Sequence, residues 1–282
     1  MSRPKGWYKQ LTIRPVLPVD GYQSYEKICG HVADIYFPII DEDKIRRLVK
    51  ENATDSRYIS AYTLFQVGKS KCPAYWVNED LLTALMKSKM SVEIENLNWA
   101  MRTGIFMLPK GAILSPENHS IEAIYWHCDI ENDLLYWTAV DKVSSFCRRF
   151  RITNNANKFT YSDVEDMDSE TVVEFNTYLQ SIFLRLLLIM EARPEYIDTQ
   201  SARVVVNKGF SKKNDKDYYE PLWIGKSYRL KREGKEVTGS GTGGSKSPHW
   251  RQGFLRNQAY GEGYKERKLV WIEPVFVVGG GE

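Results

Sequence analysis

The stretch that decides the fold is Ser169–Arg193, SETVVEFNTYLQSIFLRLLLIMEAR, which has the longest helical pattern in the sequence. Apolar residues recur in it every three or four positions and form a wide face: Val172, Val173, Phe175, Leu179, Ile182, Phe183, Leu186, Leu187 and Met190. Pro194 ends the pattern, and Asp168 or Ser169 is suited to cap the first turn. A helix face this apolar has to be buried. We therefore expect this helix at the centre of the core.

Strand-like segments precede this helix. Gly104–Leu108 and Ser120–Asp129 are short and rich in apolar and aromatic residues. Leu134–Val140 follows the second of them after Glu131–Asp133, a polar sequence that is typical of a turn. These two segments therefore predict an antiparallel hairpin. Phe150–Tyr161 is polar and rich in asparagine, and we expect a loop or an exposed strand there.

The first hundred residues have helical patterns instead. Tyr25–Ile39, Asp41–Lys50 and Glu79–Lys89 each carry apolar residues at helical spacing, and Asn78 precedes the third as a candidate N-cap. The sequence therefore predicts an α+β protein, with a helical N-terminal region followed by a mostly antiparallel sheet packed on one long central helix.

We place the boundary between these two regions near residue 100, giving 1–100 and 101–282. Within the second region, Gly234–Ser247 reads GKEVTGSGTGGSKS and has a single apolar residue. Glycine- and serine-rich segments of this kind behave as flexible linkers. We therefore predict a flexible linker at about 234–247.

Neither a secretory signal nor a membrane span is expected. No apolar run follows the basic residues at the start of the chain, and Ile182–Met190, interrupted by Arg185, falls short of the about 20 residues that cross a bilayer. We therefore expect a cytoplasmic protein with no membrane partner.

No motif predicts a metal or a cofactor. The four cysteines form no CxxC pair and have no histidine at zinc-finger spacing: they are Cys29, Cys72, Cys128 and Cys147. The glycine-rich linker lacks the lysine that a phosphate-binding loop requires after its second glycine, and neither HExxH nor GxSxG occurs. We therefore expect a protein without metal or cofactor.

Charge is unevenly distributed along the chain. The net charge is +3, but Arg203–Lys268 contains 16 Lys/Arg against 7 Asp/Glu, a local balance of +9 that leaves −6 for the remainder. A basic segment of this kind suits an acidic partner, either nucleic acid or an acidic protein surface.

The C-terminal block Ser247–Pro274 combines cations with aromatic rings. Arginine forks bind carboxylate or phosphate, and Trp, Tyr and Arg dominate the binding energy of protein interfaces. The same mixture also serves RNA. The candidate binding residues are His249, Trp250, Arg251, Arg256, Tyr260, Tyr264 and Trp271.

Two other interpretations of this block stay open. A metal-independent ribonuclease would use His249 as general acid or base, with Arg251 and Arg256 holding the phosphate. Alternatively, the rings fill the core and the glycines Gly253, Gly261 and Gly263 make turns.

The block also resembles an anti-CRISPR family found on phages and plasmids, whose named member is the second of the type V-A inhibitors. The sequences PHWRQGF, YGEG and KLVWIEPVFV carry the resemblance at residues 248–277. Upstream, GIFMLPKG, IYWHCDI, LIMEARPEYID and PLWIGKSYRL follow in the same order. The resemblance covers roughly Gly104–Val278.

This resemblance implies a binding protein that lowers the amount of a type V CRISPR effector. It would recognise the effector's N-terminal polypeptide during translation, with loss of the messenger RNA and with the ribosome or RNA as further partners. The chain departs from the family pattern at Gln252, where an arginine is common, and at Phe254, where a histidine is common. We therefore expect peptide binding, with metal-independent ribonuclease or RNA binding as the alternative.

Overall fold

A computed structural model gives the fold for most of the chain beyond residue 55. The described residues are 46–47, 56–70, 72–91, 103–132, 134–141, 145–151, 170–198, 204–205, 218–219, 222–230, 232–233 and 249–277. The predicted helix Tyr25–Ile39 and the predicted linker Gly234–Ser247 lie outside these residues. Of Asp41–Lys50, only Arg46 and Arg47 are described, and both are helical. A helical N-terminal region is therefore not established.

The centre of the fold is a seven-stranded sheet in the order β6-β5-β4-β3-β1-β10-β7. Four of its six strand pairings are antiparallel, and β1 pairs in parallel with both β3 and β10. The sheet is therefore mostly antiparallel, as predicted. Its strands are β1 (Ala74–Val77), β3 (Thr103–Met107), β4 (Ala123–Asp129), β5 (Leu134–Val140), β6 (Ser145–Arg151), β7 (Ile197–Asp198) and β10 (Leu222–Ile224).

The predicted β4–β5 hairpin is confirmed, with the 3₁₀ turn η1 (Ile130–Asn132) between its strands. Asp129 closes this turn by accepting hydrogen bonds from the backbone and side-chain nitrogens of Asn132. The expectation for Phe150–Tyr161 is corrected at its start: β6 lies earlier, and Phe146 and Phe150 are buried in it. The adjacent Arg148 and Arg149 interrupt the apolar alternation of this strand, although Arg148 shares the face of Phe146 and Phe150 and donates to the Val173 carbonyl of the long helix.

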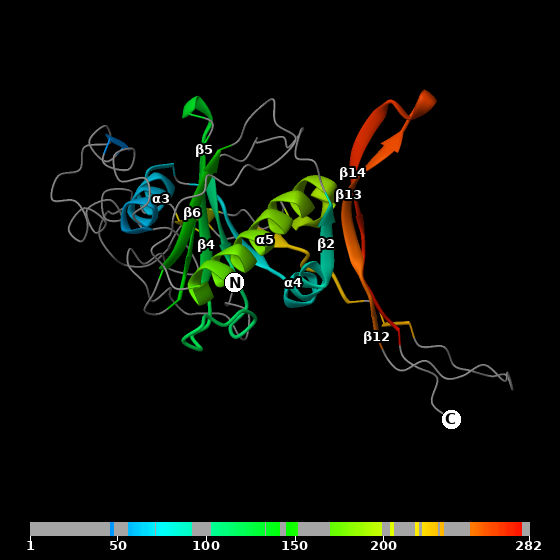
Figure 1. Cartoon of the computed structure of the whole chain (residues 1–282), viewed down its shortest axis with the longest axis horizontal. Helices are drawn as coiled ribbons and strands as arrows, with labels where there is room; N and C mark the ends of the chain where they lie inside the picture. The colour runs from blue at the N-terminus through cyan, green and yellow to red at the C-terminus, as the bar shows by residue number, and fades with distance from the viewer. Residues whose placement is uncertain are drawn as a thin grey trace, which may run out of the picture.

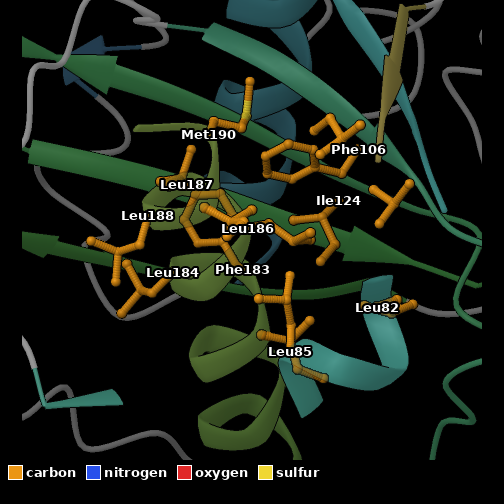
Figure 2. Packing of buried hydrophobic residues seen from close by; sticks show 14 of the residues in the cluster. Leu82, Leu85, Phe106, Ile124, Phe183, Leu184, Leu186, Leu187, Leu188 and Met190 are labelled. Carbon is orange, nitrogen blue, oxygen red and sulfur yellow. The ribbon is translucent and has the colours of Figure 1, made fainter. Parts of the chain in front are cut away.

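The long helix α5 (Glu170–Ala192) packs on one face of this sheet, as predicted. Figure 2 shows Phe183 and Leu186 of α5 beside Phe106 and Ile124 of the strands. Phe183 contacts the rings of Phe106, Trp126 and Trp137 at centroid distances of 6.1–6.3 Å. By length and composition α5 is also apolar enough to cross a membrane, but here this apolar surface forms the core.

Two further helices complete the layers. α3 (Ser56–Ser70), which the sequence reading did not predict, covers the opposite face of the sheet, where Tyr62 meets Tyr136 edge-on. α4 (Glu79–Met86) lies beside α5, and its N-cap Asn78 accepts a hydrogen bond from the Leu81 backbone N–H, as its sequence predicted. This helix ends three residues earlier than predicted because β2 begins at Ser88.

The remaining described strands form three small sheets. They are β14-β13-β2, β11-β15-β12 and β8-β9. In Figure 1 the layers follow one another as α3, the main sheet, α5 with α4, and then the long β13–β14 ribbon. The bounds of these strands are β2 (Ser88–Ser91), β8 (Val204–Val205), β9 (Tyr218–Tyr219), β11 (Arg232–Glu233), β12 (His249–Arg251), β13 (Gly253–Tyr260), β14 (Glu266–Ile272) and β15 (Val275–Val277).

One position in the main sheet is too crowded for any side chain. Gly104 of β3 lies directly opposite Trp126 of β4, and a Cβ at Gly104 would overlap the six-membered ring of that indole. Trp126 is fully buried and stacks on Phe106 at 4.3 Å between ring centroids. The indole therefore has no room to move away.

We predict that Gly104→Ala destabilises the fold by about 1–3 kcal/mol, because an added methyl group forces buried side chains out of their packing. Denaturant unfolding followed by tryptophan fluorescence measures this change. The matched control is Gly104→Ala in a Trp126→Leu background, where the smaller side chain leaves space. An equal cost in both backgrounds would contradict the steric explanation.

Candidate functional site

The C-terminal candidate residues lie on one long hairpin, residues 249–277, which we call the arm. β12 pairs with β15, and β13 pairs with β14, all antiparallel. The register is the same in both parts, since Arg251 lies opposite Val275 and Phe254 lies opposite Ile272. Pro274 lies in the interruption between them, where a residue without an N–H cannot donate to the ladder. The arm is therefore one continuous ribbon with two faces.

The inner face of the arm is buried at its base. Leu255 and Trp271 are opposite each other across the ribbon, and both are at most 4% exposed. They belong to the same core cluster as α5 and α4. Farther along this face, Asn257 and Leu269 are half-buried. The burial of the inner-face side chains by the rest of the protein therefore decreases towards the tip.

Trp271 lies where the arm contacts the layers of the main sheet, α5 and α4. We call these layers the body and this contact region the joint. Its indole Nε1 donates a hydrogen bond to Ser88 Oγ at 3.1 Å, and Ser88 Oγ in turn donates to the Ala84 carbonyl of α4 at 2.9 Å. The same indole contacts the rings of Tyr196 and Tyr228 at 6.2 and 5.7 Å. Elements from four separate parts of the chain therefore meet at this side chain.

The second contact of the joint is polar. Tyr196, in the 3₁₀ turn η2 (Pro194–Tyr196) after α5, donates from its hydroxyl to Glu273 Oε1 at 3.2 Å. The guanidinium of Arg193 lies 4.8 Å over the Tyr196 ring and donates to the same hydroxyl. Burial, together with the nearby Glu273 carboxylate, raises the pKa of Tyr196 to about 12.

The backbone also holds the arm against the body. The first half of β13 pairs in parallel with β2, from Gly253 beside Ser88 to Arg256 beside Ser91. A Cβ at Gly253 would overlap Ser88 Oγ and approach Pro274. Gly253 is therefore required by close strand packing, which corrects the alternative in which it makes a turn.

The outer face of the arm is exposed. Alternation along β13 and β14 gives it four successive cross-strand pairs: Phe254–Ile272, Arg256–Val270, Gln258–Lys268 and Tyr260–Glu266. Phe254 and Ile272 are 39% and 41% exposed, which is unusual for side chains of this size. Lys268 Nζ lies 5.5 Å over the Tyr260 ring, and Glu266 accepts a hydrogen bond from the Tyr260 hydroxyl, which raises the pKa of that phenol.

The tip of the arm, residues 261–265, presents one ring to solvent. It contains the 3₁₀ turn η4 (Glu262–Tyr264), and Gly261 and Gly263 have positive φ, as glycines in turns often do. Tyr264 is 73% exposed and itself has a φ of 56°, a conformation that is rare for a bulky residue. Arg267 Nη1 donates to the Tyr264 carbonyl at 2.9 Å and supports this strained turn.

The structure divides the predicted site residues into groups. Tyr260 and Arg256 share the outer face, and Tyr264 stands at the tip. Trp250 is half-buried against Phe276, its cross-strand partner, at 5.1 Å between ring centroids. Trp271 belongs to the buried joint, so its ring is not part of the exposed surface.

The three residues of the ribonuclease alternative are not on one face. His249 and Arg251 are two positions apart on β12 and therefore point the same way. The register is continuous from β12 into β13, so side chains keep alternating between the two faces. Arg256 is an odd number of positions from both His249 and Arg251, and it therefore points to the other face. No group of three His, Cys, Asp or Glu side chains within the described ranges is placed to hold a metal ion.

Sequence reasoning did not select the apolar part of the outer face or the joint. Phe254, Val270 and Ile272 alternate with buried residues, and reading the block as two paired strands would have separated the two sets. Ser88, Tyr196 and Tyr228 lie far from the block in sequence, and no local signal connects them to Trp271.

Together, the layers and the arm define a mixed α/β protein with a projecting β-ribbon that carries exposed rings and cations. The model of the anti-CRISPR type V subtype A2 family, AcrVA2-like, matches residues 75–279, well over half of the chain. The chain belongs to this family, which confirms the resemblance drawn from the sequence. Neither the curated proteins nor the solved structures include a significant match to it.

We predict that Ser88→Ala destabilises the fold by about 1–3 kcal/mol, because it leaves the buried Trp271 N–H without an acceptor. Urea unfolding gives the free energy, and limited proteolysis shows whether cleavage within the arm becomes faster. Thr177→Ala, which removes a hydroxyl from the exposed side of α5, is the control and should change neither. If the two variants behave alike, the joint does not depend on this hydrogen bond.

We also predict a pH dependence from Tyr196. Its folded-state pKa of about 12 exceeds the value of about 10 for an unfolded chain, so the unfolded state loses the proton first. Stability therefore falls as pH rises from about 10 to 12 and is unaffected below that window. Tyr196→Phe removes this contribution, and its unfolding free energy should fall less steeply across the window. Parallel pH profiles for the two proteins would rule the effect out.

Proposed function

We propose that this chain is an anti-CRISPR protein that acts by binding, and that its arm recognises a polypeptide segment of a CRISPR effector. Family membership supports the anti-CRISPR role. The observation that carries the binding role is the position of exposed apolar side chains. Of the seven large ones within the described residues, four lie on the arm, namely Phe254, Tyr260, Tyr264 and Ile272.

Rings and aliphatic side chains exposed together mark interaction surfaces. The arm presents them beside the cations Arg256 and Lys268, and Arg and Tyr are the residues that most often dominate binding energy at protein interfaces. The tip turn is held by its own hydrogen bonds, so the backbone of Tyr264 loses little conformational freedom on binding.

The segment that we propose is the N-terminal polypeptide of a type V effector as it leaves the ribosome. A nascent segment is extended, and an extended chain suits a ribbon because it can add its own backbone hydrogen bonds to a strand edge. β14 is the outermost strand of its sheet within the described part of the chain. Binding would then lower production of the effector in the bacterial cytoplasm, with loss of its messenger RNA.

In this proposal the chain is a binding protein and not the nuclease. A ribonuclease centred on His249 would need Arg251 and Arg256 to reach the same phosphate, and the alternation along the arm separates them. RNA binding without catalysis is the outcome to be distinguished from peptide recognition, and its affinity would fall steeply with salt.

The test is a pull-down with the purified chain from a lysate that translates a type V-A effector messenger RNA. We predict recovery of the nascent effector polypeptide after ribonuclease treatment, and a loss of about tenfold for Tyr260→Ala combined with Tyr264→Ala. Tyr178→Ala is the control, because Tyr178 on α5 is as exposed as Tyr260, at 39% each.

Two results would contradict this proposal. The first is recovery of RNA with no preference for any polypeptide, which would favour an RNA-binding role for the arm. The second is an equal loss for the arm variant and the Tyr178 variant, which would show that the rings of the arm have no special part in binding.

A further inference from the structure

The side chains on the outer face of the arm change in chemical character from base to tip. Its base is apolar, with Phe254, Ile272 and Val270 in the first two cross-strand pairs. Its middle is cationic, with Arg256 in the second pair and Lys268 in the third. The Tyr260 ring follows in the fourth pair, nearest the tip.

The two cations of this face, Arg256 and Lys268, outnumber its one acidic residue. Arg256 is exposed and makes no ion pair within the described residues. Lys268 lies over the Tyr260 ring, and the one acidic residue of the face, Glu266, accepts a hydrogen bond from Tyr260. The middle of the face therefore has an unbalanced positive charge next to an uncovered apolar surface.

We infer that this face binds an extended polypeptide segment with a defined pattern: two carboxylates two residues apart, next to bulky apolar residues on one side. Arg256 of β13 and Lys268 of β14 are diagonal neighbours on adjacent strands, and such neighbours lie about 7–8 Å apart, close to the spacing of about 7 Å between alternate residues of one extended chain. An extended segment lying along the ribbon has the same repeat, so its alternate side chains match this spacing. Its apolar residues would cover Phe254, Val270 and Ile272.

The composition of the face favours a polypeptide over a nucleic acid. The eight residues of the face include two aliphatic side chains, Val270 and Ile272, and aliphatic side chains do not stack on bases. The outer face also carries only two cations against the carboxylate of Glu266, which is little positive charge for a surface that would follow a phosphate backbone. An apolar centre bordered by charge is instead the common composition of a protein interface.

This inference rests on the proposed binding function and specifies its ligand. The peptide pattern does not depend on which effector is bound, so the inferred pattern and the proposed effector target can fail separately. The experiment therefore uses no effector: a random 12-residue peptide library is selected on the purified full-length chain, and the selected peptides are sequenced.

We expect the native chain to enrich peptides with Asp or Glu at positions i and i+2 beside bulky apolar residues. Arg256→Glu combined with Lys268→Glu should weaken binding of these peptides about tenfold, since it replaces attraction with repulsion. The same variant should enrich Lys or Arg at i and i+2 in a new selection. The control, Lys110→Glu combined with Arg229→Glu, has the same net charge change on exposed residues outside the arm and should keep the native preference.

Three outcomes overturn the inference. The first is that the enriched peptides lack the acidic pair. The second is that both charge-reversal variants retain the acidic peptides equally. The third is that no peptide is enriched while the arm binds a fluorescent oligouridylate. If the acidic pattern is enriched but the lysate pull-down recovers no effector polypeptide, the peptide specificity stands and the proposed effector target fails.

Discussion

The burial of Trp271 is the constraint on which the arrangement of the arm depends. A strand alternates its side chains between two faces, so fixing one residue on the inside fixes every other residue of the ribbon. With the Trp271 indole held by Ser88, Tyr196 and Tyr228, its neighbours Val270 and Ile272 have to face outwards. A slip of one residue would bury Arg256 and expose Leu255, and the cost of an unpaired buried charge opposes it.

The arm also depends on the body for its direction. β2 follows α4 directly, and its parallel pairing with the first half of β13 aligns the ribbon with the layer formed by α4 and α5. The pairing with β2 ends at Arg256, beyond which β13 pairs only with β14 among the described strands, and Figure 1 shows the ribbon extending past the end of α5. The family match begins at β1 and ends after β15, so it includes both the arm and the layers that hold it. The proposed binding surface is therefore built on the part of the chain that defines the family.

The sequence predicted the local elements well and the distant contacts poorly. The apolar face of α5 and the polar turn between β4 and β5 are periodic patterns that residues close in sequence create, and both predictions were confirmed. β1 was missed because AYWV is only four residues long, and its strand character comes from parallel neighbours far along the chain. α3 was missed because its apolar residues are spread around the helix instead of forming one stripe.

The site was predictable to a similar extent. Rings interleaved with cations are visible in one sequence, so composition selected Arg256, Tyr260 and Tyr264 as candidates, and all three are exposed on the arm. Their role in binding stays a prediction. The division into an outer face and a joint was not visible, because it follows from pairing between strands and from Ser88, which lies 183 residues before Trp271.

The measurement that tests the central claim most directly is hydrogen–deuterium exchange of the full-length chain with and without a type V-A CRISPR effector polypeptide. We predict that binding slows exchange in β13, β14 and the tip between them, whereas slowed exchange confined to α3 and β4–β6 would contradict the assignment of the arm as the binding surface.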